Sequence, residues 1–408
     1  MTETFGRLVD VGERQLSDAI EGADDRKAVM AILGLLRCTL TDNYSTTSIG
    51  TAVTSWSDTF VSDVLNVAER LEIREGIGNL LSYSGVQVPT EQAELLRADR
   101  EVDSDFFAAW REVIEVLERR SVKYAVIKGV DLYRCYPNPI LRFSWDADFL
   151  VSDINEFEVA VKSIGYRRGS IGTNGDVVKL READHRLRLK YLSHGDNYYR
   201  INPSTPSVCL EPHVRLYPAD WPYDLTPDYL MGRVTRREFR GVPFQALALD
   251  DALIFACLHL HRHDVQLNSV LGGADCQLRR VFDIACFLYM HRMDVDWDRF
   301  IDKCRARRIV VPVDYCMRQV AAIFPGVRPP DLAVPDDLAL RESRAIKFST
   351  GTGRWDAIGE HSVSPLVRMF MPLCQRRSPE VSRAIEESQS IRFQDPRLEE
   401  ILRSRRNK

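Results

Sequence analysis

The chain has 408 residues, of which 45% are hydrophobic and 28% are charged, and its 55 Lys+Arg and 59 Asp+Glu residues give a formal net charge of −4. This composition is that of an ordinary soluble globular protein, and it excludes disorder over most of the chain as well as collagenous and low-complexity proteins. The near-neutral balance also argues against a protein whose main task is to coat long nucleic acid.

The sequence gives no sign of a membrane or secreted protein. It contains no apolar run of about 20 residues and no basic-then-apolar leader. Its nine cysteines are scattered and never form a Cys-x-x-Cys pair. We therefore expect a cytoplasmic protein with reduced, mostly buried thiols and no structural zinc.

Residues 1–102 indicate a helical N-terminal region. Apolar residues recur at spacings of three and four over residues 28–36 and 61–81, as on one face of a helix. The polar stretch 39–48 between them predicts a long loop, and Pro89 predicts the start of another short helix.

Residues 103–245 differ, because helical and strand-like runs alternate there. The expected elements are a helix over 106–120, strands over 124–127 and 145–151, a helix over 155–163, and short strands near 177–180, 187–191 and 208–216. Residues 172–175 and 197–199 indicate turns and loops. The alternation predicts a domain built around a β-sheet.

Residues 246–408 return to helical periodicity, which predicts a helical C-terminal domain. The expected helices cover residues 248–263, 277–289, 297–307 and 313–323, with a charged helix or frayed end over 395–408.

Asp146 and Asp148 lie inside the strand expected over 145–151. Residues i and i+2 of a strand point to one face, so both carboxylates project together while Ala147 and Phe149 point into the core. Adjacent carboxylates raise each other's pKa unless a cation lies between them, and hard oxygen ligands suit Mg²⁺ held with substrate phosphates. The pair therefore predicts a divalent-metal site, although Asp-x-Asp by itself is a common surface tripeptide.

A third carboxylate is expected from the strand over 208–216. Apolar and polar residues alternate there, which places Glu211 and His213 on one face. With the two aspartates, Glu211 would complete a two-metal site for phosphoryl or nucleotidyl transfer. His213 either orients this ligand or approaches a substrate phosphate, or it is simply a hydrogen-bonded residue of the sheet.

Lys128-Gly129 follows the strand over 124–127 and precedes an expected helix. A glycine at such a turn lets a phosphate approach backbone N–H groups and the positive end of a helix. Lys128, and Arg142 shortly before the aspartates, are candidates to neutralise phosphate charge. A glycine after a strand is usually only a turn, so the prediction depends on its order and distance relative to Asp-x-Asp.

Together these motifs resemble the uncharacterised nucleotidyltransferase family of the DNA-polymerase-β-like superfamily. The matching residues, in chain order, are 126–129, 132–133, 136–137, 142–151, 165–166 and 211–213. The resemblance covers about residues 105–305. The usual Gly-Ser of the superfamily is Gly129-Val130 here, so that no serine hydroxyl follows the glycine.

The resemblance implies an α+β fold, a minimal polymerase-β-like mixed sheet flanked by helices. It implies that Asp146 and Asp148 bind Mg²⁺, with Mn²⁺ as the other candidate, and that Glu211 supplies the third ligand. It also implies transfer of NMP from an NTP such as ATP to an acceptor, with release of pyrophosphate. The expected nucleotide-binding residues are Lys128, Gly129, Arg142 and His213.

His259 and His263 are spaced i and i+4 on the helix expected over 248–263, as paired metal ligands are. A histidine-metal phosphohydrolase is thus one alternative, but neither a His-Glu-x-x-His motif nor an evident third ligand accompanies them. We expect the two histidines instead to cap the site cleft or to form buried hydrogen bonds with Asp283.

Basic residues elsewhere in the chain are relevant to which partner the protein binds. Arg186, Arg188 and Lys190 alternate with leucines on the strand expected over 187–191, which indicates a solvated face or, alternatively, a phosphate-binding edge. The basic clusters at 305–308 and 375–377 have only partial aromatic interleaving, which disfavours a nucleic-acid acceptor. The expected partners are an NTP and an unidentified acceptor, a small molecule, peptide or protein, with no membrane.

Two hypotheses from different classes follow. The first is a Mg²⁺-dependent nucleotidyltransferase. The second is a nucleotide-binding or scaffolding protein that keeps the fold with little or no turnover, and it is motivated by Val130 after Gly129 and by Pro212 beside Glu211. A binding protein would hold Mg·NTP without releasing pyrophosphate.

Overall fold

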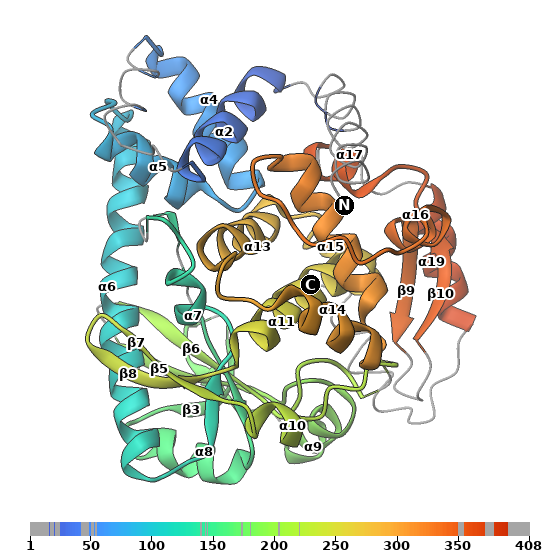
Figure 1. Ribbon diagram of the computed structural model, residues 1–408. Coiled ribbons are helices and arrows are strands. Elements are labelled where there is room, and N and C mark those ends of the chain that lie inside the picture. The colour runs from blue at the N-terminus through green and yellow to red at the C-terminus, as the bar shows by residue number, and fades with distance from the viewer. Residues whose placement is uncertain are drawn as a thin grey trace.

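The structure is a computed structural model that describes residues 16, 20, 25–41, 49, 53, 55–138, 141–142, 144, 146–172, 174–179, 181–202, 205–219, 221–349, 355–371 and 379–390. Within these residues, no helix combines the length and the apolar character that a membrane span requires. A β-sheet occupies one end of the molecule, and helices cover it and build the remainder (Figure 1).

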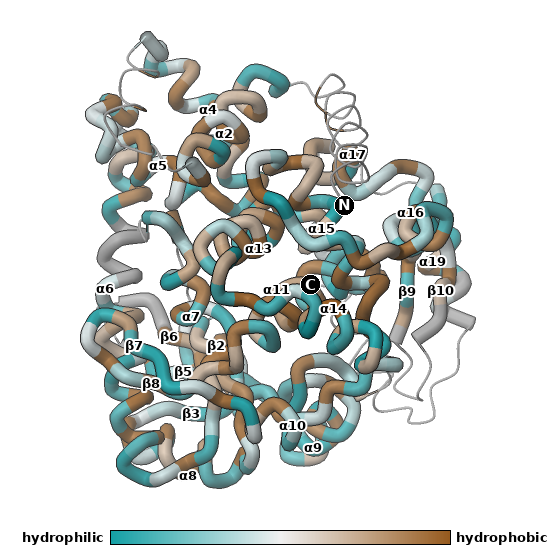
Figure 2. Tube along the Cα trace, viewed as in Figure 1, coloured by the Kyte–Doolittle hydropathy of each residue, from teal (hydrophilic) through white to brown (hydrophobic). Residues whose placement is uncertain are grey.

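The sheet has eight strands in the order β4-β3-β5-β6-β2-β1-β8-β7. The strands are β1 (Tyr124–Val126), β2 (Asp146–Val151), β3 (Arg167–Ile171), β4 (Val177–Val178), β5 (Asn197–Asn202), β6 (Thr205–His213), β7 (Thr235–Phe239) and β8 (Val242–Ala246). β2 and β6 are parallel, as are β1 and β8, and the other neighbours are antiparallel. Figure 2 shows the edge strand β7 as largely hydrophilic, which discourages pairing with another sheet.

Helices are the larger part of the described chain. They are α2 (Arg26–Thr39), α4 (Asp58–Arg70), α5 (Arg74–Tyr83), α6 (Thr90–Arg119), α7 (Val130–Tyr133), α8 (Ile154–Lys162), α9 (Glu182–Tyr191), α10 (Pro227–Met231), α11 (Leu249–Val265), α12 (Leu267–Leu271), α13 (Leu278–His291), α14 (Trp297–Ala306), α15 (Val310–Ile323), α16 (Asp336–Arg344), α17 (Pro365–Phe370) and α19 (Pro379–Ser390). A mixed sheet with flanking helices is the α+β architecture expected from the sequence.

One face of the sheet packs under α6 and α8. Phe149 of β2 joins Trp110 of α6 and Phe157 of α8 in one buried hydrophobic cluster. Because side chains alternate along a strand, Asp146 and Asp148 point to the opposite face. The alternation predicted for this strand is therefore confirmed, and it separates the apolar core from the carboxylates.

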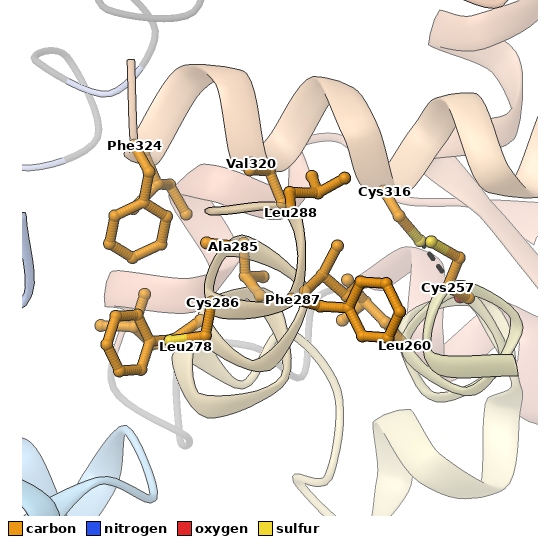
Figure 3. Packing of buried hydrophobic residues seen from close by; sticks show 14 of the residues in the cluster. Cys257, Leu260, Leu278, Ala285, Cys286, Phe287, Leu288, Cys316, Val320 and Phe324 are labelled. Carbon is orange, nitrogen blue, oxygen red and sulfur yellow. Dashed lines mark hydrogen bonds between the residues drawn. The ribbon is translucent and has the colours of Figure 1, made fainter. Parts of the chain in front are cut away.

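The other large cluster fills the space among α11, α13 and α15 and extends to α2, α4 and α5. Figure 3 shows Leu260, Phe287 and Val320 packed between these helices. Cys316 of α15 donates a hydrogen bond to the carbonyl oxygen of Cys257 on α11, at 3.1 Å. Six of the eight cysteines in the described part are buried, and none of these eight is in a disulfide. Because this cluster includes residues of α2, α4 and α5 as well as of α11, α13 and α15, the N-terminal and C-terminal helices share one core.

The strand expected over 187–191 is wrong, because these residues form the second half of helix α9. Acidic residues occupy its first turn, while Arg188 and Lys190 lie in its last turn, a charge order that stabilises a helix through its dipole. The basic residues therefore do not share a strand face. Leucines at every second position had predicted a strand, but a ten-residue helix can carry the same short pattern. The alternation therefore did not distinguish a strand from a helix here.

The structure also contains strands that the sequence did not predict. Residues 197–199, interpreted as a loop, begin β5, where Tyr198 is buried and donates a hydrogen bond to Glu158, at 2.8 Å. The helical C-terminal region also contains an antiparallel pair, β9 (Ala345–Ser349) and β10 (Trp355–Glu360). The expected helix over 395–408 lies outside the described residues, as does most of the loop at 39–48.

Glu342 of α16 ties this helix to α11 and β9. Its carboxylate accepts a hydrogen bond from His261 at 2.6 Å and pairs with Lys347, and its side chain is 15% exposed. Burial works against the charged form, but His261 and Lys347 lower the pKa of Glu342 to about 2. The folded protein therefore binds fewer protons here than the unfolded chain, whose glutamates titrate near pH 4.5.

We expect Glu342→Gln to lower the free energy of unfolding at pH 7 by at most about 3 kcal/mol. The stabilisation is complete above about pH 4.5 and is lost as the pH falls toward about 2, so the two proteins should converge in acid. Urea unfolding at several pH values measures this, with the exposed Asp337→Asn on the same helix as a control. A difference between Glu342→Gln and wild type that stays constant from pH 7 to pH 3 would contradict it.

Candidate active site

Two adjacent parallel strands bring the predicted carboxylates together. In the register of β2 with β6, Asp148 lies opposite Glu211 and Asp146 lies opposite Cys209. Asp146, Asp148 and Glu211 line one cavity of about 250 Å³ between the sheet and helices α11 and α13. This cavity is our candidate active site.

Lys128 and Gly129 enter the same cavity from the end of β1. The Lys128 ammonium lies 2.7 Å from Asp148 Oδ1. Gly129 has φ +53°, and a Cβ there would lie 3.2 Å from the carbonyl oxygen of Asp146, so the turn favours glycine. The helix that follows, α7, is a single short turn, and its dipole adds little to anion binding.

Ser144 supplies a hydroxyl beside this glycine, although no serine follows Gly129 in the chain. Its Oγ would lie 3.4 Å from a Cβ at Gly129, and it donates to the carboxylate or the carbonyl oxygen of Asp146, each at 3.1 Å. Sequence reasoning missed Ser144, because it had looked for the serine directly after the glycine. In the described structure this hydroxyl is therefore hydrogen-bonded to Asp146.

The electrostatics of the cavity differ among the three carboxylates. Burial, aided by Asp146 and opposed by Lys128, raises the pKa of Asp148 to about 6. Burial and then Asp148 raise the pKa of Glu211. Burial also acts to raise the pKa of Asp146, but Lys128, Arg279 and Arg142 lower it below its usual value. Burial and mutual repulsion thus disfavour the charged forms of Asp148 and Glu211, and a divalent cation bound between the carboxylates would relieve that repulsion.

Lys128 is the resident cation of this cluster. Burial acts to lower its pKa, but the carboxylates of Asp148, Asp146 and Glu211 raise it above its usual value. Lys128 is therefore charged at neutral pH and bound to the central carboxylate.

His213 is the last residue of strand β6, and its side chain is buried beside the carboxylates. Its Nε2 is 3.1 Å from Asp148 Oδ1 and 4.0 Å from Glu211 Oε2. Burial, followed by the charge of Lys128, lowers the pKa of His213 to about 3, so the neutral ring donates its N–H to Asp148. His213 therefore contacts Asp148 rather than Glu211, the carboxylate that the sequence suggested it would orient, and its role stays a prediction.

Asn197 is a second residue that sequence reasoning missed. From β5 its Nδ2 donates to Glu211 Oε1 at 2.7 Å. The signal was weak, since Asn197 follows a glycine and an aspartate and resembled part of a loop. Its contact fixes the rotamer of the third carboxylate.

Arg142, His259 and His263 also line the cavity. Arg142 Nε lies 3.0 Å from Asp283 Oδ1, and Tyr136 donates to the same oxygen at 2.5 Å. Asp283 thus takes these contacts from Tyr136 and Arg142, and the expected hydrogen bond from the histidines is not among those that the described residues form.

The two histidine rings contact each other, with their centroids 4.6 Å apart. His263 Nδ1 is 3.2 Å from Ser269 Oγ. Burial lowers the pKa of both histidines, with Lys128 as the next cause for His259 and Arg280 for His263. Both rings are neutral at physiological pH.

The donor groups of the cavity fit a divalent metal ion. One ligand atom each of Asp148, Glu211 and His213 lies within 4.8 Å of the others, and Asp148 Oδ2 is buried with no hydrogen-bond partner among the described residues. Carboxylate oxygens from Asp146, Asp148 and Glu211 suit Mg²⁺ or Mn²⁺. His213 is already hydrogen-bonded to Asp148, so we assign it to positioning that carboxylate rather than to the metal.

Comparisons with known proteins bear on this site. A family model described as uncharacterised nucleotidyltransferase matches residues 58–325. Among solved structures, the chain is similar to MenT4, a nucleotidyltransferase toxin from Mycobacterium tuberculosis H37Rv, at 13% identity and a TM-score of 0.32, covering 83% of this chain and 98% of that chain. A comparison with curated proteins finds no match. The family match runs from the start of α4 to just beyond α15, so it includes both walls of the cavity.

Proposed function

Because the chain belongs to the uncharacterised nucleotidyltransferase family, we propose that it transfers NMP from an NTP to an acceptor in a Mg²⁺-dependent reaction that releases pyrophosphate. The observation that carries this proposal is the convergence of Asp146, Asp148 and Glu211, from two adjacent parallel strands, on one cavity. Carboxylates so placed are the ligand set for a two-metal site.

The three carboxylates and the two residues that orient them each have a part in this proposal. Asp146, Asp148 and Glu211 would hold Mg²⁺ or Mn²⁺, which supplies Lewis-acid stabilisation of the attacking and leaving oxygens. His213 orients Asp148, and Asn197 orients Glu211. The acceptor oxygen, which gives its proton to solvent where the acceptor is a hydroxyl, forms a bond to the α-phosphorus, the bond from that phosphorus to the bridging oxygen breaks, and pyrophosphate leaves with the electron pair.

We also propose that residues 103–245 form the nucleotidyltransferase core. The helical regions 1–102 and 246–408 would then shape the space around it and decide which small molecule or peptide acts as the acceptor. The wall formed by α11 and α13 supports this division, because it faces the carboxylates directly.

A catalytically weak nucleotide-binding or scaffolding protein is the second candidate. The observation in its favour is Lys128, whose ammonium already lies 2.7 Å from the central carboxylate and competes with a metal ion there. Such a protein would bind nucleotide with weak metal dependence and without turnover.

Titration of the purified chain with each of the four NTPs, with and without Mg²⁺, tests the first candidate. We expect metal-dependent binding of at least one NTP, and pyrophosphate release once a suitable acceptor is present. The control is Asp302→Asn, an 80% exposed aspartate on α14. Binding of Mg·NTP without pyrophosphate release across an acceptor panel would favour the second candidate as a nucleotide-binding protein, and no binding of any NTP by folded protein would refute the nucleotidyltransferase and leave the scaffolding role.

A further inference from the structure

A second group of charged residues lines the cavity opposite the carboxylates. Arg262 comes from α11, and Arg279 and Arg280 come from the first turn of α13. The two helices pack against each other, and Figure 1 shows them side by side near the middle of the molecule. We call these three residues the arginine face.

The guanidinium groups of the arginine face are poorly satisfied. Arg280 donates to the carbonyl oxygen of Ala274 at 2.6 Å, and Arg262 lies 3.3 Å from His263 Nε2. The Nε atom of each of the three arginines is buried without a hydrogen-bond partner among the described residues. Within that part of the chain, neither Arg262 nor Arg280 forms an ion pair within 4 Å.

This arrangement costs stability. A partly buried cation without a counter-ion loses part of its hydration shell, and no new interaction compensates for that loss. Burial lowers the pKa of Arg262, and burial together with Arg279 lowers the pKa of Arg280 to about 10. Charged groups kept in such an environment are typical of a site that binds an oppositely charged ligand.

The other cations of the cavity are already engaged. Lys128 pairs with Asp148, and Arg142 pairs with Asp283. Arg279 pairs with Glu72, so within the described residues Arg262 and Arg280 are the cations of the cavity whose positive charge is most available to a ligand. A ligand that satisfies both walls must carry metal ions toward the carboxylates and negative charge toward the arginines, and a metal-bound nucleoside triphosphate does both.

We propose that Arg262, Arg279 and Arg280 bind the β- and γ-phosphates of the NTP donor. This inference rests on the proposed function and names the part of the substrate that the second wall recognises. Planar guanidinium groups form paired hydrogen bonds with phosphate oxygens, which suits them to this task. The cavity volume, about 250 Å³, is below the roughly 300–1,000 Å³ of a pocket that encloses a whole drug-sized ligand, so it takes the charged end of the nucleotide.

The N-terminal helices support the arginine face through Glu72. Glu72 lies in the turn between α4 and α5, with φ +59°, and its carboxylate forms an ion pair with Arg279 at 3.3 Å and accepts a hydrogen bond from the side-chain amide of Gln277. These contacts fix the start of α13, where Arg279 and Arg280 project into the cavity. They give the N-terminal region a direct connection to the nucleotide site.

Calorimetry on the full chain tests the inference with three ligands in the presence of Mg²⁺: the preferred NTP, the corresponding NMP and inorganic tripolyphosphate. The variants are Arg262→Gln and Arg280→Gln, and the matched control is Arg305→Gln, whose side chain is 55% exposed on α14. We expect each of the two variants to weaken NTP and tripolyphosphate binding about 10- to 100-fold and to leave NMP binding unchanged.

The ligand-free proteins provide an independent readout. Because the variants remove poorly satisfied charge, their thermal midpoints should equal or exceed that of the wild type, which separates lost binding from lost folding. Tripolyphosphate binding that is lost in both variants supports the arginine face even if no pyrophosphate release is ever detected, in which case only the proposed function fails.

Three results would overturn the inference. Variants that bind NTP and tripolyphosphate as tightly as the wild type would refute it while leaving the proposed function in place. Variants that keep NTP affinity but lose binding of a short RNA oligonucleotide would assign the arginine face to an acceptor. A wild type that binds neither NTP nor tripolyphosphate would refute both proposals.

Discussion

Asp148→Asn is expected to lower the rate of nucleotidyl transfer by about a thousandfold, since a metal site supplies several kcal/mol of transition-state stabilisation. Asp148 is the central residue of the site. It lies opposite Glu211 in the sheet, accepts a hydrogen bond from His213 and pairs with Lys128. Asparagine keeps the shape but removes the charge that a divalent ion needs. Pyrophosphate release under saturating NTP measures the effect.

The fold should survive this substitution. Burial already raises the pKa of Asp148 to about 6, so a neutral side chain is tolerated at this position. The thermal midpoint of Asp148→Asn should therefore stay close to that of wild type, and Glu211→Gln should lose activity in the same way. Asp302→Asn, on the exposed side of α14, should leave both rate and midpoint unchanged. Unchanged transfer by Asp148→Asn would remove the carboxylates from the mechanism.

Local patterns were enough to predict the carboxylate face. The i, i+2 spacing in β2 puts Asp146 and Asp148 on one side, because strand geometry alone decides it. The same rule, applied to β6, puts Glu211 and His213 together. The contact between Asp148 and Glu211 required more, since it depends on the register of two strands far apart in the chain. Glu211 was expected as the third carboxylate from the alternation in its strand and from metal chemistry, and the family resemblance agreed, but neither gave the register.

Long-range packing produced what the sequence could not predict. Arg262, Arg279 and Arg280 line the cavity with the carboxylates only because tertiary packing brings α11 and α13 to it, and no local pattern encodes that placement. Asp283 illustrates the same point. The sequence suggested the nearby histidines as its partners, but the folded chain brings Arg142 and Tyr136 to it instead. Charged groups choose partners by tertiary geometry, which spacing along one helix does not reveal.

A buried polar network holds the segment between α11 and α13, the two helices of the arginine face. Asp264, at the end of α11, accepts hydrogen bonds from Tyr315 at 2.7 Å and from the backbone N–H of Cys276 at 2.6 Å. Arg368 of α17 is 1% exposed and lies 3.0 Å from Asp275 Oδ2, which is fully buried. The network therefore links α17 to the loop that positions α13.

We expect Arg368→Met to lower the free energy of unfolding by about 3–5 kcal/mol, because it removes a guanidinium from a buried carboxylate. Adding Asp275→Asn should recover part of this loss, since the double variant no longer buries the aspartate charge. Urea denaturation of the two variants and the wild type measures both effects. A double variant less stable than Arg368→Met would show that the charge of Asp275 stabilises the fold by other contacts. If the double variant instead recovers stability yet binds NTP more weakly, the network acts on the nucleotide site through the position of α13.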